Sequence, residues 1–144
     1  MIDRMYSLDK APLAQLEACA GAEGFQIVRR LVDDYTSGAN TFSRPGEALY
    51  CCRRNGIPIA VGGVNQEAIA QFSDAGRIRR VYVHPDARRS GVGTALICRI
   101  IEDARDHFEI LTCNVGTKEA YGFYEKLGFR RVCVDGITHV YECT

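Results

Sequence analysis

The residues with the clearest chemical potential lie in a turn that contains two glycines, Gly91 and Gly93. The turn joins an expected strand that ends at residues 79–83 to an apolar, helix-like stretch that follows residue 94. The first turn of a helix exposes unpaired N–H groups and a partial positive charge, which suit a pyrophosphate. Glycine lacks a Cβ atom, so the backbone can approach an anion closely. We therefore expect the amides of residues 88–94 to bind phosphate groups.

Neither of the two best-known phosphate-binding motifs explains this turn. The sequence has no Gly-x4-Gly-Lys-Ser/Thr loop, and the turn lacks the third glycine of a dinucleotide-binding fold. A lone Gly-x-Gly is equally well explained by a plain tight turn. The pattern here is more specific, because a strand, an Arg-x-x-Gly-x-Gly segment and an apolar helix follow one another directly. Arg88 and Arg89 add mobile charge at the rim of the turn. This combination favours a phosphate site.

A second distinctive segment, at residues 120–129, reads Ala-Tyr-Gly-Phe-Tyr-Glu-Lys-Leu-Gly-Phe. Together the two segments resemble the GNAT superfamily of N-acetyltransferases: the first is similar to its pyrophosphate loop, and the second to its Ala-x-x-Phe-Tyr-Glu-Lys-Leu-Gly-Phe motif. The resemblance covers nearly the whole chain, with both motifs in the family's order. It implies an α/β GNAT-like fold, a mixed and mostly antiparallel sheet flanked by about four helices, with residues 1–144 forming a single acetyltransferase domain.

The resemblance also implies how acetyl-CoA is bound. Backbone groups of Val81 and Val83 would bond the pantetheine arm like an added strand, and the N–H of Val83 would polarise the thioester carbonyl. Tyr124 matches the tyrosine near the coenzyme sulfur, where it would act as general acid, whereas Phe123 beside it would pack into the core. The implied coenzyme contacts are Val81, Tyr82, Val83, Arg88, Arg89, Ser90, Gly91, Val92, Gly93, Thr94, Asn114, Thr117, Phe123 and Tyr124.

Two positions depart from the family pattern. Many members carry a glutamate at the start of the fourth strand as general base, and this sequence has Arg77 there; Thr117 stands where asparagine is common. Glu67 and Asp74 are the candidates for a relocated base, and we expect both to be solvated loop charges. A water chain could suffice instead, because holding a neutral amine against the thioester contributes about 7–11 kcal/mol, which exceeds a deprotonation penalty of about 4.6 kcal/mol at pH 7.

Hydrophobic periodicity and turn residues predict the order of the elements. A helix capped by Asp9 comes first, followed by a second helix over residues 25–35 that ends at Gly38. Two strands, at residues 48–52 and 57–61, form a hairpin that turns at Asn-Gly. The prediction continues with a strand at 78–83, a helix from about 91 to 108, a strand at 110–115, a short helix at 120–127 and a final hairpin of strands at 131–134 and 137–143.

Composition narrows the class of protein further. The chain has 144 residues, 47% of them apolar and 25% charged, with no net charge. These values are typical of a globular domain and exclude disorder. The longest nearly apolar run, at residues 57–64, is too short to span a membrane, and the N-terminus lacks the pattern of a signal peptide.

The cysteines and histidines offer no metal site. No two of the seven cysteines have Cys-x-x-Cys spacing, which argues against a zinc knuckle and a thioredoxin-type motif, and most lie in apolar runs, as Cys98 and Cys133 do. We expect buried, reduced thiols, no metal and a cytoplasmic address. His84 stands at a strand end, and His107 and His139 are expected to be structural or exposed.

The favoured function is transfer of an acetyl group from acetyl-CoA to a primary amine, by direct attack in a ternary complex. A catalytically silent GNAT-fold module that binds acyl-CoA is an alternative, because Arg77 and Thr117 depart from the family pattern. A nucleic-acid binder that uses the arginines of residues 77–89 is a further one, but the neutral net charge argues against it, so neither a nucleic-acid nor a membrane partner is expected.

The sequence carries no motif for the acceptor amine. Glu47, Asp33 and Asp34 could attract a cationic amine, although solvated helix and loop charges are the commoner explanation of such residues. The oligomeric state is not determined by the sequence, and a homodimer is possible by analogy with the family.

Overall fold

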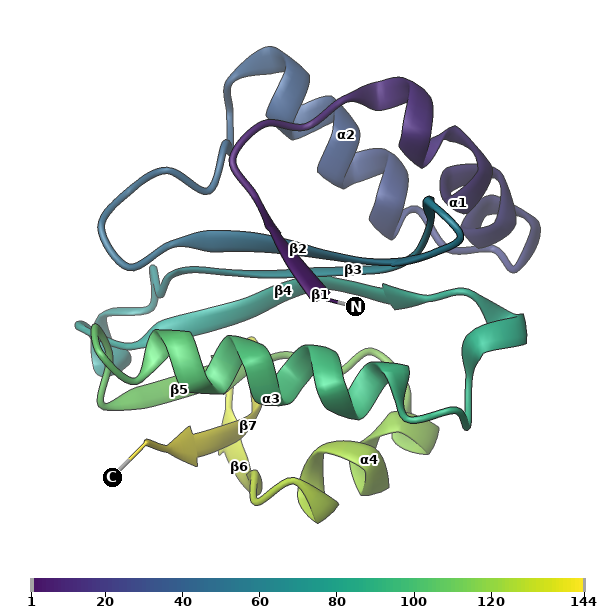
Figure 1. The fold of residues 1–144 in the computed structure, drawn as a ribbon. Helices are drawn as coiled ribbons and strands as arrows, with labels where there is room; N and C mark the ends of the chain where they lie inside the picture. The colour runs from purple at the N-terminus through teal and green to yellow at the C-terminus, as the bar shows by residue number, and fades with distance from the viewer. Residues whose placement is uncertain (1, 144) are drawn as a thin grey trace.

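The computed structural model describes residues 2–143, which form one seven-stranded sheet with helices on both faces (Figure 1). The strands follow the spatial order β1-β2-β3-β4-β5-β7-β6 and are β1 (Ile2–Met5), β2 (Ala48–Arg54), β3 (Ile57–Gln66), β4 (Gly76–Val83), β5 (Ile110–Cys113), β6 (Arg130–Val134) and β7 (Ile137–Glu142). The helices are α1 (Lys10–Ala22), α2 (Ile27–Ser37), α3 (Val92–Ala104) and α4 (Tyr121–Lys126). Neighbouring strands are antiparallel except for β4 and β5. The predicted fold class is confirmed.

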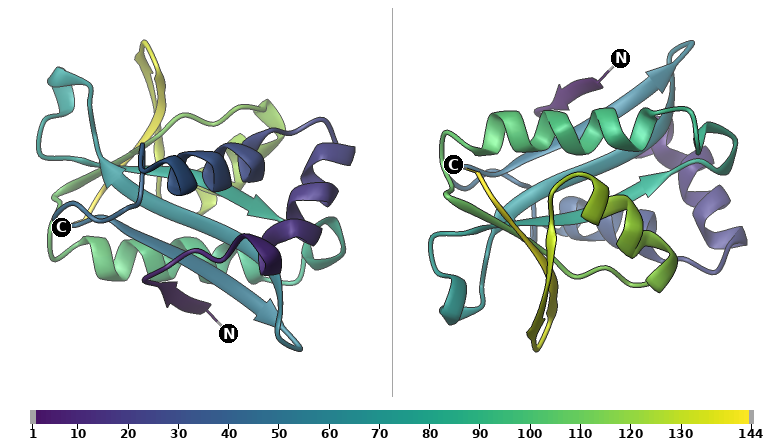
Figure 2. Two further views of the ribbon diagram at one scale, coloured as in Figure 1. Left: turned by 90° about the horizontal axis from the view of Figure 1, so that it is seen from above. Right: turned by 90° about the horizontal axis from the view of Figure 1, so that it is seen from below.

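Two hydrophobic cores hold the helices to opposite faces of the sheet. α1 and α2 bury Leu16 and Val28 against the face that carries Val61. α3 buries Leu96 and Ile100 against the other face, and Figure 2 shows the two helix pairs on opposite sides of the strands. This two-sided cover follows from helices with one apolar stripe and central strands with apolar side chains on both faces.

The sheet opens between its two parallel strands. β4 pairs with β5 only over residues 76–78, opposite residues 111–113, although β4 continues to Val83. The β3–β4 register shifts near Gly62, and Arg80 in that stretch of β4 has a left-handed φ of 59°. Such a bulge bends a strand and increases its twist. The backbone of β4 beyond Ile78 therefore has no strand beside it on the β5 side.

Two differences from the predicted elements have physical causes. β1 was not predicted, because this four-residue edge strand carries Asp3 and Arg4 and lacks a buried face that a pattern could reveal. β3 extends to Gln66 rather than ending at Val61, and the extension passes through glycines, which usually weaken strands. A Cβ on Gly62 would lie 3.2 Å from the Leu96 side chain, so this glycine allows α3 to pack closely on β3.

The expectation that the cysteines in apolar runs are buried was wrong for Cys98 and Cys133. Cys98 on α3 and Cys133 on β6 are exposed, whereas Cys51, Cys52, Cys113 and Cys143 are buried. An apolar run does not decide which of its residues faces inward, because helix and strand geometry turns neighbouring side chains in different directions. No disulfide links cysteines within residues 2–143, and no helix of that range is long and apolar enough to cross a membrane.

Candidate active site

The opening between β4 and β5 forms a cavity of about 890 Å³. It brings together residues that lie far apart in the sequence, from the start of α2, β4, the turn before α3, the segment after β5 and α4. Most of the predicted coenzyme contacts line it: Val81, Tyr82, Val83, Arg88, Arg89, Gly91, Gly93, Thr94, Asn114, Thr117, Phe123 and Tyr124. Ser90 and Val92 do not line it. The Ser90 hydroxyl donates to the carbonyl of Ala87, and Val92 packs against the core.

The turn before α3 has the geometry of an anion site. Gly91 is the N-cap of α3 with a left-handed φ of 84°, and the first helical hydrogen bond runs from the Ala95 N–H to the Gly91 carbonyl at 3.0 Å. The amides of residues 92–94 precede that bond and have no acceptor within the helix. A Cβ on Gly91 would meet no atom within 4 Å, so the space in front of the turn is open. The turn fits a pyrophosphate.

Arg88 is not the mobile charge that the sequence suggested. Its guanidinium forms two hydrogen bonds to the Glu23 carboxylate, at 2.7 and 2.8 Å, and its Nε donates to the Val83 carbonyl at 3.1 Å. The Tyr82 hydroxyl donates a hydrogen bond to the same carboxylate, so the Tyr82 side chain is held under α1 and α2. These contacts tie the end of β4 to the end of α1. Arg89 stays exposed at the turn and has no ion pair within the described range.

Tyr124 lies on the inner side of the short helix α4 and is only 8% exposed. The helix ends in a Schellman motif: the Phe129 N–H donates to the Tyr124 carbonyl at 3.1 Å, and the Gly128 N–H donates to the Glu125 carbonyl at 3.2 Å. The ring of Tyr124 packs edge-on against Phe123 and Phe129. Its hydroxyl has no hydrogen-bond partner within residues 2–143, and the residue lines the cavity. Burial, and to a lesser degree the neighbouring Cys113, raise the pKa of Tyr124.

The sequence predicts that Phe123 packs into the core while Tyr124 lies near the coenzyme, but the structure does not separate the two residues in this way. Phe123 is half-buried and Tyr124 is buried, although both line the cavity. Phe123 also packs on the turn, because a Cβ on Gly93 would lie 3.4 Å from its ring. The ring of Phe123 therefore spaces α4 from the start of α3.

Glu67 is not the solvated loop charge that we expected. Its side chain is 1% exposed and accepts hydrogen bonds from Arg77 at 3.1 Å, from the Thr112 hydroxyl at 2.5 Å and from the Ile69 N–H at 3.0 Å. Burial raises the pKa of this carboxyl, but the hydrogen bonds and the charge of Arg77 together hold it below its ordinary value. A carboxylate stabilised in this way is a weak base. Asp74, by contrast, is exposed as expected.

We predict that Glu67→Gln destabilises the protein without removing its activity. The change leaves the guanidinium of Arg77, which is 20% exposed, without a counter-ion, so a loss of about 2–4 kcal/mol and a Tm lower by about 5–15 °C are expected. Because folding lowers the pKa of Glu67, its stabilisation is present above pH 4.5 and is lost as the pH falls through the folded-state value. Thermal melts between pH 3 and 7 should therefore show less acid sensitivity in the variant.

Asp74→Asn is the matched control, since it makes the same kind of change at an exposed carboxylate and should alter neither Tm nor turnover. A loss of about a hundredfold in kcat/KM for Glu67→Gln, measured where the variant is folded, would identify Glu67 as a relocated base.

The histidines lie outside the cavity lining. His84 accepts the Asp86 N–H through Nδ1 at 3.0 Å. His139 is fully buried, with Nε2 2.7 Å from Glu125 and Nδ1 2.9 Å from the Thr138 hydroxyl. These contacts assign both side chains to structure.

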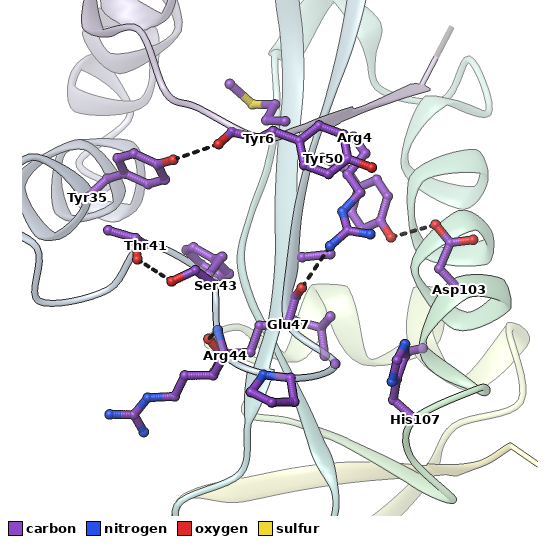
Figure 3. Close-up of a pocket in the computed structure, with 17 residues that line it drawn as sticks. Arg4, Tyr6, Tyr35, Thr41, Ser43, Arg44, Glu47, Tyr50, Asp103 and His107 are labelled. Atoms are coloured by element: carbon purple, nitrogen blue, oxygen red, sulfur yellow. Dashed lines mark hydrogen bonds between the residues drawn. The ribbon is translucent and has the colours of Figure 1, made fainter.

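A second hollow, of about 630 Å³, lies near the β1 edge of the sheet, between the end of β1, the loop that precedes β2 and α3 (Figure 3). Its polar groups are largely paired with one another: the Tyr50 hydroxyl donates to Asp103 at 2.6 Å, and the hydroxyls of Thr41 and Ser43 lie 2.7 Å apart. It contains neither a glycine turn at a helix start nor any predicted coenzyme residue. Most of the residues singled out in the sequence therefore lie at the cavity between β4 and β5 and not at this hollow.

The chain matches the Acetyltransferase (GNAT) family over residues 10–129 and belongs to that family, the class of acyl-CoA-dependent acetyltransferases. A crystal structure from Exiguobacterium sp. 255-15, of a protein provisionally assigned as an acetyltransferase, is 33% identical with a TM-score of 0.87, and the match covers 99% of this chain and 92% of that one. An aminoglycoside 6′-N-acetyltransferase complexed with coenzyme A shares the fold at 12% identity and a TM-score of 0.74, over 100% of this chain and 97% of that one.

A curated relative, an uncharacterized N-acetyltransferase of Methanocaldococcus jannaschii, is 32% identical over 91 residues. The match covers 60% of this chain and 40% of that protein, so the chain spans less than half the length of this relative.

Proposed function

We propose that this protein transfers the acetyl group of acetyl-CoA to a primary amine, by direct attack within a ternary complex. The observation that carries the proposal is the cavity between β4 and β5, which is lined both by the helix start at Gly91 and by the buried hydroxyl-bearing residue Tyr124. The first suits a pyrophosphate, and the second suits a sulfur leaving group. In this proposal residues 1–144 act as one acetyltransferase domain, in the cytoplasm.

The proposed donor site uses backbone groups more than side chains. The Arg88 N–H donates to the Pro85 carbonyl at 3.2 Å, so the amides of residues 89–94 would hold the pyrophosphate, with Arg89 adding charge at the rim. Beyond Ile78, β4 has no strand beside it on the β5 side, and there it would bond the pantetheine arm through Val81 and Val83. Asn114 and Thr117 line the same cavity and offer polar contacts. When bound there, acetyl-CoA supplies an activated thioester.

Deprotonation of the amine is proposed to need no dedicated base. Arg77 occupies the family's usual glutamate position, and Glu67 is held by that arginine. Glu119, the one acidic residue of the lining, is exposed. Since alignment against the thioester contributes about 7–11 kcal/mol and deprotonation at pH 7 requires about 4.6 kcal/mol, water can take the proton.

Turnover with a panel of primary amines, measured as free thiol released from acetyl-CoA, tests the proposal. Thiol release that depends on an amine supports it. Tight binding of acetyl-CoA without release for any amine would instead support the silent module, which the arginine at position 77 favours. A steep salt dependence of DNA or RNA affinity would point to the nucleic-acid alternative.

A further inference from the structure

The cavity carries positive charge along β4 and α2 as well as at the turn where the phosphates of the donor are proposed to bind. Its lining contains six arginines and one acidic residue. Carboxylates from neighbouring elements neutralise three of these arginines, in the pairs Arg77–Glu67, Arg80–Asp34 and Arg88–Glu23. The other three make no ion pair within residues 2–143, and they are Arg30, Arg79 and Arg89.

Two of the unpaired arginines, Arg30 and Arg79, lie on the α2 side of the sheet. Arg79 pairs across β3–β4 with Gly63, and a Cβ on Gly63 would contact Phe42, which belongs to the core under α1 and α2. Directly opposed residues of neighbouring strands share a face, so Arg79 also faces that side. Arg30 stands on α2 itself and lines the same cavity.

The guanidinium groups on this side have unused hydrogen-bonding capacity. Arg79 is partly buried, and burial together with the charges of Arg80 and Arg77 lowers its pKa. The Nε of Arg80 is buried and has no hydrogen-bond partner in the described part of the chain. An unpaired polar group or charge that is removed from water is unfavourable unless a ligand compensates it. An anion in this part of the cavity would do so.

The phosphates of acetyl-CoA are not that anion. They are proposed to lie at the turn before α3, whereas Arg79 precedes the end of β4 by four residues, about 13 Å along an extended strand. The pantetheine arm that would run beside β4 is uncharged. An anion bound beside Arg79 would therefore belong to the second substrate.

We propose that the acceptor is an amine whose molecule also carries a carboxylate or a phosphate, and that Arg79, with Arg30 at the cavity mouth, binds this anionic group. The inference rests on the proposed acetyl transfer and names the substrate class of the same site. Phe25 and Ile27 also line the cavity and can pack against an apolar portion of the acceptor.

The acidic residues that the sequence offered for a cationic acceptor are engaged elsewhere. Asp34 pairs with Arg80, and Asp33 pairs with Arg29 on the exposed side of α2. Glu47 is buried and accepts the N–H groups of Arg44 and Gln66. None of the three lines the cavity.

The test compares acceptors that differ only in their anionic group. Thiol release from acetyl-CoA is measured with 4-aminobutyrate against 4-aminobutyramide, phenylalanine against phenylalaninamide, and O-phosphoethanolamine against ethanolamine, with 1,4-diaminobutane as the cationic acceptor. We expect kcat/KM to be at least about tenfold higher for the anionic member of a pair. The carboxylate and phosphate pairs show which group is recognised.

Arg79→Gln should lower kcat/KM for the preferred anionic acceptor by about 10- to 100-fold, mainly through KM, and leave its neutral partner unchanged. Arg29→Gln is the matched control, since Arg29 lies on the same helix as Arg30 but is 68% exposed and pairs with Asp33; it should change neither. Preference for the neutral or cationic acceptors, or an equal loss for both members of a pair in Arg79→Gln, would overturn the inference.

If CoA binds but no amine causes thiol release, the proposed function fails. Calorimetry then tests the anion site separately. Titration of the same compounds into the CoA-bound protein should then show binding of an anionic compound that Arg79→Gln abolishes. Absence of such binding would overturn the inference as well.

Discussion

Replacing Gly91 by valine is expected to raise the Kd for CoA by at least about 100-fold. Nothing lies within 4 Å of a Cβ at this position, so the new side chain does not clash with the protein. It fills the open space in front of the α3 amides, where the pyrophosphate is proposed to sit. A β-branched residue is also strained at a φ of 84°, by about 1–2 kcal/mol. Calorimetric titration of CoA into the variant measures the loss.

Gly56→Val is the control that separates blocking of the phosphate site by the new side chain from backbone strain at a positive φ. Gly56 lies in the β2–β3 turn, has a φ of 78° and likewise has no atom within 4 Å of an added Cβ. Both variants should therefore lose similar stability, with Tm lower by about 2–8 °C, but only Gly91→Val should lose CoA. Unchanged CoA binding in Gly91→Val would remove the turn from the donor site.

Tyr124→Phe is expected to reduce kcat by about 100-fold with little change in CoA affinity. The substitution keeps the ring, which packs on Phe123 and Phe129, and removes only the hydroxyl. That hydroxyl is proposed to protonate the departing CoA thiolate, whose conjugate acid has a pKa of about 8.5. General acids typically contribute about 10²–10⁴-fold, and a thiolate is a tolerable leaving group, so the lower end applies.

The pH profile gives a second readout of the same role. Because burial raises the pKa of Tyr124, the hydroxyl stays protonated above the usual range of tyrosine. The kcat of the wild type should therefore rise with pH as the amine deprotonates and show no tyrosine-dependent decline up to pH 10. Tyr121→Phe, one turn earlier on α4, is the control and should leave kcat unchanged. Equal kcat for wild type and Tyr124→Phe, with chemistry rate-limiting, would reduce Tyr124 to a packing residue.

Local sequence signals were sufficient for much of the fold. The Asp9 cap of α1, the end of α2 at Gly38, the Asn55-Gly56 hairpin and the Schellman end of α4 were all predicted. Each depends on backbone preferences of residues that are neighbours in the chain. The short edge strand β1 and the extension of β3 were not predictable, because both form only when a partner strand or α3 is in place.

The sequence by itself determined the family and was enough to propose the phosphate-binding turn and the role of the tyrosine of α4, because each of these rests on a contiguous pattern with its own local geometry. Tertiary structure alone decided which charges are neutralised. Arg88 and Glu23 are 65 residues apart, and Arg80 and Asp34 are 46 apart. No spacing rule reveals pairs that helix packing and strand register create. For that reason Glu67 was read as a solvated charge and Arg88 as a mobile one, and the unpaired Arg79 became visible only in the folded protein.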